Sequence, residues 1–257
     1  MDMFDLTGKV AVITGASSGL GEDAAWAYAR QGADIAIFAR REERLKAIAE
    51  DITKETGHRV LPVKCDVSKE EDVKAGVEKV FAEFGKIDIL LNNAGVAFAG
   101  CVDTMDEDEW DRGMNTNVKS IYLMSKYIVP HMKERKYGKI VNLASINAVV
   151  GDKGDMFSRH VYNASKGAVR GLTIGMAATY MEHGITVNAV GPALFESEMT
   201  KDTLMTDAYK PVYCEICPAG RTGQKGELNG TLLYLSSDAS SYVTGQLILV
   251  DGGFTSV

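Results

Sequence analysis

Two rhythms of apolar and polar residues alternate along this chain. Short, nearly continuous apolar runs rich in β-branched residues are typical of strands that are buried on both faces. The longer segments between them carry the patterns of helices. The predicted strands are Lys9–Thr14, Ile35–Phe38, Val60–Val63, Ile87–Leu91, Lys139–Leu143, Ile185–Val190 and Leu247–Val250. The predicted helices are Gly19–Gln31, Arg41–Thr56, Lys69–Phe84, Asn117–Arg135, Tyr162–Glu182 and Gln224–Ser236.

This alternation predicts an α/β fold in which helices cover both faces of a parallel sheet. A chain of 257 residues suits one domain of this class. There is no repeat, low-complexity stretch or Pro/Gly/Ser linker, so we expect residues 1–257 to form a single domain. Two segments break the rhythm, the polar loop Gly151–His160 and the long connection Phe195–Arg221. Long connections in such folds are usually functional, so we expect residues 195–221 to form a lid or binding loop.

Composition and charge narrow the class of partners. Hydrophobic residues make up 46% and charged residues 25%, as in globular proteins. The net charge of −7 offers no positive surface to nucleic acid or to an acidic membrane. No apolar run reaches the roughly 18 residues that a membrane span needs. The N-terminal segment MDMFDLTGK lacks the apolar stretch of a secretory signal. We therefore expect a cytoplasmic protein that acts on a small molecule.

The four cysteines are few for a chain of this length, which indicates thiols in a reducing compartment rather than a disulfide framework. Cys214 and Cys217 form a C-x-x-C pair, but a structural zinc site would need two further ligands at similar spacing. We expect no metal site and interpret the pair as coincidence, with redox or metal chemistry as the alternative.

The first predicted strand runs into the glycine-rich segment Thr14–Gly21 (TGASSGLG), which opens a helix. Glycines let the backbone turn tightly beside a pyrophosphate, and the start of a helix offers free N–H groups. A turn of this kind can also be purely structural, but its place after the first strand favours dinucleotide binding. The spacing is G-x-x-x-G-x-G. The residues predicted to contact a cofactor here are Gly15, Ser17, Ser18, Gly19, Leu20 and Gly21.

The end of the second predicted strand indicates which dinucleotide is bound. An NAD site usually places a carboxylate there for the ribose, about 20 residues beyond the loop. This chain instead has Arg40 and Arg41. Because guanidinium groups pair well with a 2′-phosphate, we expect NADP(H), with NAD(H) as the less favoured cofactor. Alternatively, the two arginines simply begin a solvated helix.

Tyr162 and Lys166 lie four residues apart at the start of a predicted helix and therefore share a face. A neighbouring ammonium favours a phenolate, so we expect Lys166 to lower the pKa of Tyr162. Such a tyrosine can give a proton to a carbonyl or take one from an alcohol. Ser145 follows the fifth predicted strand and can polarise the same oxygen. A Tyr and a Lys at this spacing often occur by chance, but here they accompany the phosphate loop and Ser145.

At this point the chain resembles the short-chain dehydrogenase/reductase family over its whole length. The resemblance rests on Thr14–Gly21, on Asn92–Gly95 (NNAG), on the set of Ser145, Tyr162 and Lys166, and on the C-terminal segments VTGQ and VDGG. It implies a seven-stranded Rossmann fold with strand order 3-2-1-4-5-6-7 and the site at the carboxyl ends of the strands. It also implies hydride transfer at nicotinamide C4 and a homotetramer.

The resemblance assigns further roles. Asp66, followed by Val67, matches the residue beside the adenine, and Asn93, followed by Ala94 and Gly95, matches the segment beside the cofactor. Asn117 matches a helix asparagine that holds a water of a proton relay with the lysine. The remaining residues that it predicts for cofactor binding are Pro192, Phe195 and Ser197, together with Tyr162 and Lys166.

Two departures from the family pattern stand out. Ala193 replaces a glycine after the sixth predicted strand, which puts the contact with the nicotinamide carboxamide in doubt. Ser197 stands where a threonine is usual and keeps a hydroxyl. More residues than usual also separate Ser145 from Tyr162, and they fall in the loop Gly151–His160. We interpret this enlarged loop as a determinant of specificity.

The substrate is the least determined feature. We predict that Ser145, His160, Tyr162 and Met199 contact it. The apolar residues of the lid region, Phe195, Met199, Leu204, Met205, Tyr209, Val212 and Tyr213, suit a bulky apolar substrate but equally the packing of the lid itself. The charged residues Asp152, Lys153, Asp155, Arg159 and His160 suit a polar or anionic substrate but equally a solvated loop.

Three substrate classes fit the resemblance: sugar acids such as gluconate, 3-oxoacyl carrier-protein thioesters and hydroxysteroids. The pattern is most similar to gluconate 5-dehydrogenase-like and 3-oxoacyl reductase-like members. The basic stretch Lys133–Lys136 suits an acidic carrier protein or a solvated helix end.

The sequence disfavours two other classes of function. A dinucleotide-binding sensor would have no need to keep Asn117, Ser145, Tyr162 and Lys166 together. A serine hydrolase would need a G-x-S-x-G elbow around Ser145, which is absent. We therefore expect an oxidoreductase.

Overall fold

Seven parallel strands form one sheet in the computed structural model, which describes residues 3–154, 157–201 and 204–257. Their order is β3-β2-β1-β4-β5-β6-β7, which confirms the predicted Rossmann topology. The strands are β1 (Val10–Thr14), β2 (Asp34–Ala39), β3 (Val60–Lys64), β4 (Ile89–Asn92), β5 (Gly138–Leu143), β6 (Ile185–Pro192) and β7 (Leu247–Val250).

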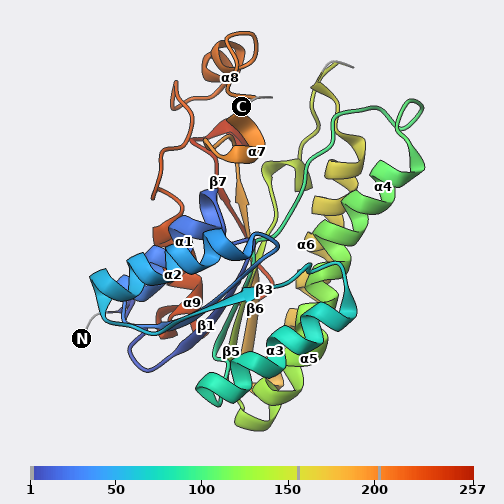
Figure 1. The fold of residues 1–257 in the computed structure, drawn as a ribbon. Helices are drawn as coiled ribbons and strands as arrows, with labels where there is room; N and C mark the ends of the chain where they lie inside the picture. Colours follow the sequence, from blue (N-terminus) through green and yellow to red (C-terminus); the bar gives the residue numbers. More distant parts are fainter. Residues whose placement is uncertain (1–2, 155–156, 202–203) are drawn as a thin grey trace.

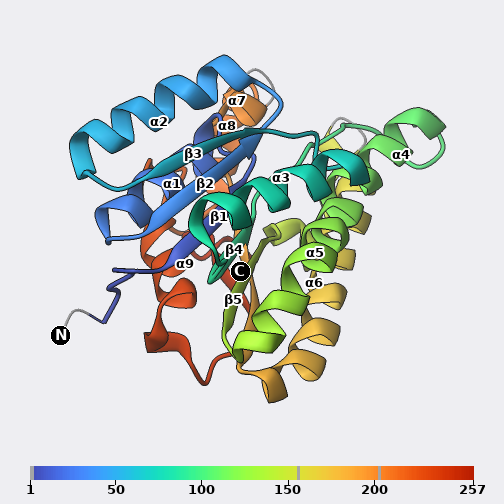
Figure 2. The ribbon, with the colours of Figure 1, turned by 60° about the horizontal axis from the view of Figure 1, so that its bottom comes forward.

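Helices cover both faces of this sheet, as Figures 1 and 2 show. One face carries α1 (Gly19–Arg30), α2 (Glu42–Thr56) and α9 (Asn229–Ser236). The other face carries α3 (Glu70–Phe84), α5 (Ser120–Arg135) and α6 (His160–Tyr180). Three further helices complete the described residues: α4 (Glu107–Met114), α7 (Glu198–Lys201) and α8 (Lys210–Ile216). In Figure 1, α7 and α8 lie at the top, above the upper end of the sheet.

The sheet separates two apolar layers. Val12 packs with Phe38 and Ile128 towards α3 and α5, whereas its neighbour Ile13 packs with Ile35 and Leu45 towards α1 and α2. Successive side chains of a strand point to opposite faces, so a strand buried on both faces must be apolar throughout. This is the physical reason why the continuous apolar runs identified the strands.

Three predicted helix starts differ from the structure by two residues or more. The helix predicted at Asn117 begins earlier, because α4 continues through a π-helical turn (Asn115–Lys119) into α5. The helix predicted at Gln224 begins at Asn229, since Gly226 (φ +89°) lies in the preceding turn. The helix predicted at Tyr162 begins at His160, so the loop predicted to reach His160 ends at Arg159.

Three helices escaped prediction. Helix α4 has the sequence EDEWDRGM and buries only Gly113, so it lacks the apolar periodicity from which helices are predicted. Helices α7 and α8 are short, and both lie in the segment that was predicted as a lid. None of the helices in the described part of the chain has the length and apolar character that a membrane crossing requires.

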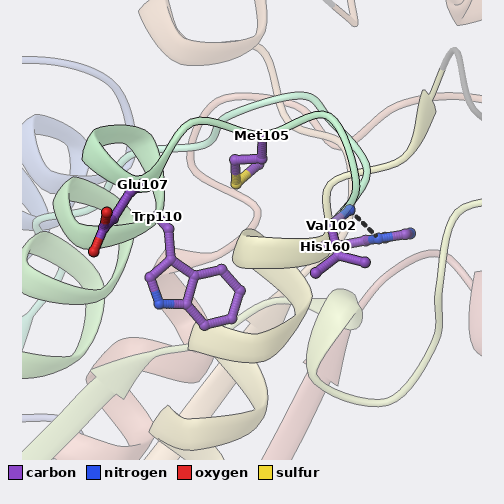
Figure 3. Close-up of a pocket in the computed structure, with 5 residues that line it drawn as sticks. All are labelled: Val102, Met105, Glu107, Trp110 and His160. Carbon is purple, nitrogen blue, oxygen red and sulfur yellow. Dashed lines mark hydrogen bonds between the residues drawn. The ribbon is translucent and has the colours of Figure 1, made fainter.

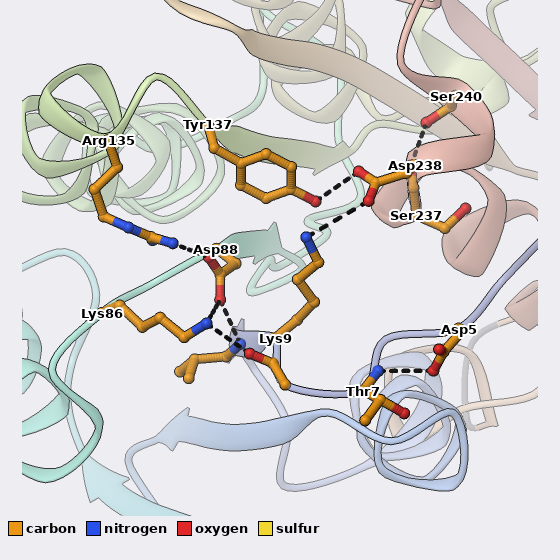
Figure 4. Close-up of polar contacts among 12 residues, drawn as sticks. Asp5, Thr7, Lys9, Lys86, Asp88, Arg135, Tyr137, Ser237, Asp238 and Ser240 are labelled. Atoms are coloured by element: carbon orange, nitrogen blue, oxygen red, sulfur yellow. Dashed lines mark hydrogen bonds and ion pairs between the residues drawn. The ribbon is translucent and has the colours of Figure 1, made fainter.

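A buried carboxylate ties the amino ends of two central strands to α5, as Figure 4 shows. Asp88 is only 1% exposed. Its oxygens accept hydrogen bonds from Arg135 Nη2 (2.7 Å) and the Val10 backbone N–H (2.9 Å), and Lys86 Nζ lies 3.0 Å away. Burial alone would raise the pKa of Asp88, but these hydrogen bonds outweigh it and lower the pKa.

Replacing Asp88 with Asn should therefore lower stability at neutral pH. A carboxyl whose pKa is lowered by folding stabilises the protein above its ordinary pKa and loses this effect as the pH falls through the folded value. We expect Asp88→Asn to cost about 2 kcal/mol at pH 7, because the charged hydrogen bonds to Arg135 and Lys86 are lost. The difference in stability between the variant and the unmutated protein should shrink below about pH 4. Thermal unfolding at matched protein concentration measures it, and a gap that is constant with pH would contradict the assignment.

Candidate active site

The predicted site residues gather at the carboxyl ends of the strands around β1. This strand is flanked by β2 on one side and by β4 on the other, so the connections from β1 and β4 diverge to opposite faces. Ligands of open α/β sheets bind in the crevice that forms at such a switch point.

The glycine-rich loop between β1 and α1 is held in shape by its neighbours. Gly15 has φ +66°, which favours glycine. Asn93 Nδ2 donates to Thr14 O (2.9 Å) and to Gly15 O (3.2 Å), and a Cβ at Gly21 would overlap these same groups. Thr14 Oγ1 in turn accepts from the backbone N–H groups of Asn93 (2.9 Å) and Ala94 (3.0 Å). Asn93 and Ala94 of the NNAG segment thus support this loop directly.

The N-terminus of α1 suits an anion. Ser18 is its N-cap residue and makes no side-chain capping hydrogen bond, so the first N–H groups of this 12-residue helix keep their capacity to donate. Arg41 lies beside them, because its Nη2 donates to the hydroxyls of Ser17 (3.0 Å) and Ser18 (3.0 Å). Free N–H groups and a guanidinium form the donor set that a dinucleotide phosphate requires.

A carboxylate of the segment predicted as a lid already pairs with this cluster. Glu198 Oε2 lies 2.8 Å from Arg41 Nη2, and its other oxygen pairs with Arg44. Hydrogen bonds from Arg41, Arg44 and Ser18 hold the pKa of Glu198 at about 2. Sequence reasoning missed Glu198, because nothing in the local pattern links it to residues 150 positions earlier.

The predicted adenine side of the site is built around Asp66. Its Oδ1 accepts hydrogen bonds from the N–H and the hydroxyl of Ser68 (3.1 and 2.7 Å), and Val67 is buried next to it. Burial would raise the pKa of Asp66, but the bonds from Ser68 and the charge of Arg40 lower it. Arg40 is exposed on the same side.

Ser145 and Tyr162 line one cavity, and Lys166 and Asn117 lie close to each other nearby. Lys166 is 4% exposed, and its Nζ donates to Leu143 O (2.7 Å) and lies 5.4 Å from the centre of the Tyr162 ring. A Cβ at Gly95 would lie 3.2 Å from Asn117 Oδ1 and 3.7 Å from Lys166 Nζ, so these two side chains are close.

Asn117 lies in the π-helical turn between α4 and α5. Its Oδ1 accepts from Val96 N (2.8 Å), and its Nδ2 donates to Val96 O and Ser165 Oγ (both 2.9 Å). Turns of this kind are common at functional sites. The amide therefore ties the loop after β4 to the helix that carries Tyr162 and Lys166.

The lowering of the Tyr162 pKa that was expected from Lys166 does not dominate in this structure. Burial raises the pKa of Tyr162, and hydrogen bonding from Ser145 offsets this only in part. Burial also lowers the pKa of Lys166 to about 8. Desolvation disfavours both charged forms, and the ammonium lies 5.4 Å from the centre of the ring, so burial outweighs their attraction. Tyr162 is thus a protonated acid at neutral pH.

The cavity beside Ser145 and Tyr162 has a volume of about 310 Å³. Its walls are mainly apolar, and its polar side chains Asn147, Asp152 and Arg159 form a hydrogen-bonded chain to Ser145. The apolar lining includes Ile146, Val150, Phe157, Leu194, Met199, Leu204, Tyr213 and Phe254, and the polar side chains are Asn147, Asp152, Arg159, Thr200, Thr206 and Tyr209.

The segment predicted as a lid closes one side of this cavity. Phe195 is buried against Gly223, Ser197 packs over Gly19 of the phosphate loop, and the exposed Met199 lines the cavity. Pro192 ends β6. Ala193 N donates to Val250 O (3.2 Å), and its φ is not positive, so the departure from glycine brings no backbone strain here.

His160 lies apart from this cavity. Its Nδ1 accepts a hydrogen bond from Val102 N (3.0 Å), and its ring borders a separate hollow with Met105, Glu107 and Trp110, as Figure 3 shows. The structure therefore does not bring His160 together with Ser145 and Tyr162. The loop residues that line the cavity with them include Asp152 and Arg159, which sequence reasoning weighed only among several charges.

Residues 155 and 156 of the same loop, including the candidate Asp155, lie outside the described residues. Cys65, Cys101, Cys214 and Cys217 are free thiols. Among the described residues no group of three or more His, Cys, Asp or Glu side chains is arranged to hold a metal ion.

Comparisons with known proteins agree with this geometry. A family model described as enoyl-(acyl carrier protein) reductase matches residues 15–255. The chain is 37% identical to gluconate 5-dehydrogenase of Gluconobacter oxydans, with 99% of this chain and 97% of that protein covered. It is 35% identical to a 3-oxoacyl-(acyl-carrier-protein) reductase of Chlamydia muridarum, with coverage of 96% and 98%. The structure of a gluconate 5-dehydrogenase from Burkholderia cenocepacia in complex with NADP and tartrate superposes with a TM-score of 0.94, 36% identity, and coverage of 100% and 98%.

Proposed function

The chain belongs to the short-chain dehydrogenase/reductase family, and from that membership we propose that it is an NADP(H)-dependent oxidoreductase with Tyr162 as its acid and base. The reaction transfers a hydride between the nicotinamide and a ketone or secondary alcohol. The observation that carries the proposal is that Ser145 and Tyr162 share one cavity beside an uncapped helix N-terminus, with Lys166 and Asn117 close by.

Each of these side chains has a separate role in carbonyl reduction. NADPH, held by the loop Gly15–Gly21 and Arg41, would supply the hydride for the carbonyl carbon. Ser145 donates a hydrogen bond to the carbonyl oxygen, where negative charge develops. Tyr162 gives its proton to this oxygen, and its raised pKa keeps that proton in place at neutral pH until it is needed. Lys166 stabilises the charge left on Tyr162 and returns a proton to it through a relay, in which Asn117 holds a water.

The size of the cavity favours a small substrate. At about 310 Å³ it lies at the lower end of the range for ligand pockets. The polar side chains of Asn147 and Asp152 connect to Ser145 in one wall of the cavity, which suits a substrate with hydroxyl groups near the reacting carbon, such as a sugar acid. Gluconate 5-dehydrogenase relatives support this choice. The apolar wall around Leu194 and Met199 favours a 3-oxoacyl thioester as the second candidate, and a hydroxysteroid is the bulkiest of the three classes.

A substrate panel tests the proposal. Sugar acids, 3-oxoacyl thioesters and oxosteroids are offered with NADPH and with NADH, and turnover is followed by the absorbance of the reduced cofactor. We expect the highest kcat/KM for NADPH with a small hydroxylated ketone. Tight cofactor binding without turnover of any ketone or alcohol would instead support a dinucleotide sensor.

Arg40 and Arg41 should determine the preference for NADP(H). Replacing both with Ser removes the guanidinium groups on the side of the phosphate loop where a 2′-phosphate is expected. Charged hydrogen bonds contribute roughly 1.5–3 kcal/mol, less when exposed, so we expect the KM for NADPH to rise about 30-fold while that for NADH changes little. Arg30→Ser, which breaks a comparable exposed pair with Glu55 (2.7 Å), is the matched control. Equal affinities of the unmutated protein for NADPH and NADH would contradict this assignment.

We also infer a cytoplasmic homotetramer, which accords with the family resemblance. The four free thiols suit a reducing compartment. Trp110, Tyr122 and Ile174 are 38%, 51% and 49% exposed on α4, α5 and α6 and offer apolar surface for a subunit contact. Sedimentation at equilibrium measures the assembly.

A further inference from the structure

A chain of hydrogen bonds connects the enlarged loop after β5 to Ser145. Ser145 Oγ donates to Asn147 Oδ1 (3.2 Å), and Asn147 Nδ2 donates to Asp152 Oδ2 (2.9 Å). Arg159 then holds Asp152 with two bonds, from Nε to Oδ2 (3.1 Å) and from Nη2 to Oδ1 (2.5 Å). All four side chains lie in the wall of the cavity that Tyr162 also lines.

From this chain we propose that Asn147, Asp152 and Arg159 are positioning residues that fix the place of Ser145 Oγ, from which its hydroxyl turns to a substrate oxygen. The inference rests on the proposed function, because it assigns a purpose to a residue that acts on the carbonyl oxygen.

The ion pair decides which way the amide of Asn147 points. An ionised carboxylate only accepts hydrogen bonds, so Asp152 requires the NH₂ end of the amide to face it. The carbonyl end of the amide must then face Ser145. Ser145 Oγ also accepts from Asn147 N (3.2 Å), so backbone and side chain of one residue hold the same oxygen. When a substrate oxygen enters the cavity, it replaces Asn147 Oδ1 as the acceptor of the hydrogen bond from the Ser145 hydroxyl.

Stability alone does not explain the ion pair. The side chains of Asp152 and Arg159 are 14% and 12% exposed, and withdrawing two charges from water costs about as much as their attraction returns. The loop is anchored separately, because Asn163 Nδ2 donates to Asn147 O (3.1 Å) and Val150 O (2.8 Å). The pair is therefore available for a role in the reaction.

The pair also balances charge beside Tyr162. The groups that influence its pKa are Ser145, Arg159 and Asp152. Tyr209 also lines the cavity, and Lys166 faces the ring from the same helix. Arg159 lowers the pKa of Tyr162 and Asp152 raises it, so the two partners act in opposite directions. Removing one partner at a time should shift this pKa in opposite directions.

The experiment compares five variants by kcat, KM for NADPH and the pH profile of alcohol oxidation, which requires deprotonated Tyr162. Asn147→Ala and Asp152→Ala break the chain, and we expect each to lower kcat at least 10-fold, since a hydrogen-bond donor to the developing charge contributes about 100-fold or more. Asp152→Asn keeps an acceptor for the amide of Asn147 and should stay within about 3-fold, as neutral hydrogen bonds suffice for orientation.

The pH profiles separate positioning from mere loop structure. The rising limb should move to lower pH in Asp152→Asn, which leaves Arg159 unbalanced, and to higher pH in Arg159→Met, which leaves Asp152 unbalanced. Asn163→Ala is the matched control, because it releases the backbone carbonyls of Asn147 and Val150 but removes no side-chain hydrogen bond between Ser145 and Arg159. This variant should change the melting temperature or the substrate KM but leave the rising limb of the pH profile at the same pH. The KM for NADPH should be the same in all five variants.

Unchanged kcat in Asn147→Ala, or shifts of the same direction in Asp152→Asn and Arg159→Met, would overturn this inference. Either result leaves the proposed function intact as long as Tyr162→Phe is inactive. An active Tyr162→Phe would instead overturn the proposed function itself.

Discussion

Replacing Tyr162 with Phe should reduce kcat for ketone reduction by about 1,000-fold while the enzyme still binds NADPH. The variant loses only the hydroxyl that donates the proton, and general acid catalysis contributes roughly 100- to 10,000-fold. The ring, which Lys166 faces at 5.4 Å, remains to fill its place, so the fold and the phosphate loop should be undisturbed. Steady-state turnover with the best substrate of the panel, together with NADPH titration by fluorescence, measures both effects.

Tyr213→Phe is the matched control for this prediction. Tyr213 lines the same cavity and is only 4% exposed, but it stacks on Phe254 (centroids 5.1 Å apart) away from the predicted proton path. We expect it to keep turnover within a few-fold. Near-normal turnover of Tyr162→Phe, with Ser145 intact, would mean that the proton comes from another group.

The elements with the strongest local patterns were predictable from the sequence. The seven strands were predicted within about two residues at each end, because strands buried between α1 and α5 must be apolar on both faces. The relation of Tyr162 to Lys166 is also local, since a helix fixes it. Helix α4 was missed because its contacts are mostly with solvent, so the sequence carried no apolar stripe.

The features that escaped prediction join residues distant in the chain or in an irregular loop. The pairing of Glu198 with Arg41 and Arg44 exists only because the lid returns to the phosphate loop. Asn147 was not singled out, although it lies two residues after Ser145, because no periodicity assigns a role to a side chain in a 3₁₀ turn. His160 was expected in the substrate cavity from its nearness to Tyr162, but a hydrogen bond from Val102 holds it outside.

The burial of the Lys166 amine at the site has an energetic cost. Burial lowers its pKa from the ordinary 10.5 to about 8, so the folded protein holds this proton less tightly than the unfolded chain does. Below about pH 8 the charged amine therefore opposes folding, by roughly 3 kcal/mol for a difference of this size. The penalty fades as the pH rises from there towards 10.5, where the unfolded chain also loses the proton.

Replacing Lys166 with Met should consequently lower activity and raise stability. We expect kcat to fall at least 100-fold, because the charge beside Tyr162 is lost. The cofactor-free protein at pH 7 should become about 1 kcal/mol more stable, since relief of the burial penalty exceeds the cost of leaving Leu143 O without its 2.7 Å bond. This corresponds to a rise of about 2–4 °C in melting temperature.

The pH dependence identifies the cause of that stabilisation. The advantage of Lys166→Met over the unmutated protein should shrink between pH 8 and pH 10, because the unmutated protein then folds with a neutral amine. Lys126→Met serves as the control, since Lys126 is exposed in a pair with Glu70 and should confer no such gain. A Lys166→Met protein that is less stable at pH 7 would show that the amine stabilises the fold. The burial of Lys166 would then not reduce the stability of the protein. The expected outcome, lower activity with higher stability, is the signature of a charge that is kept buried for its chemistry.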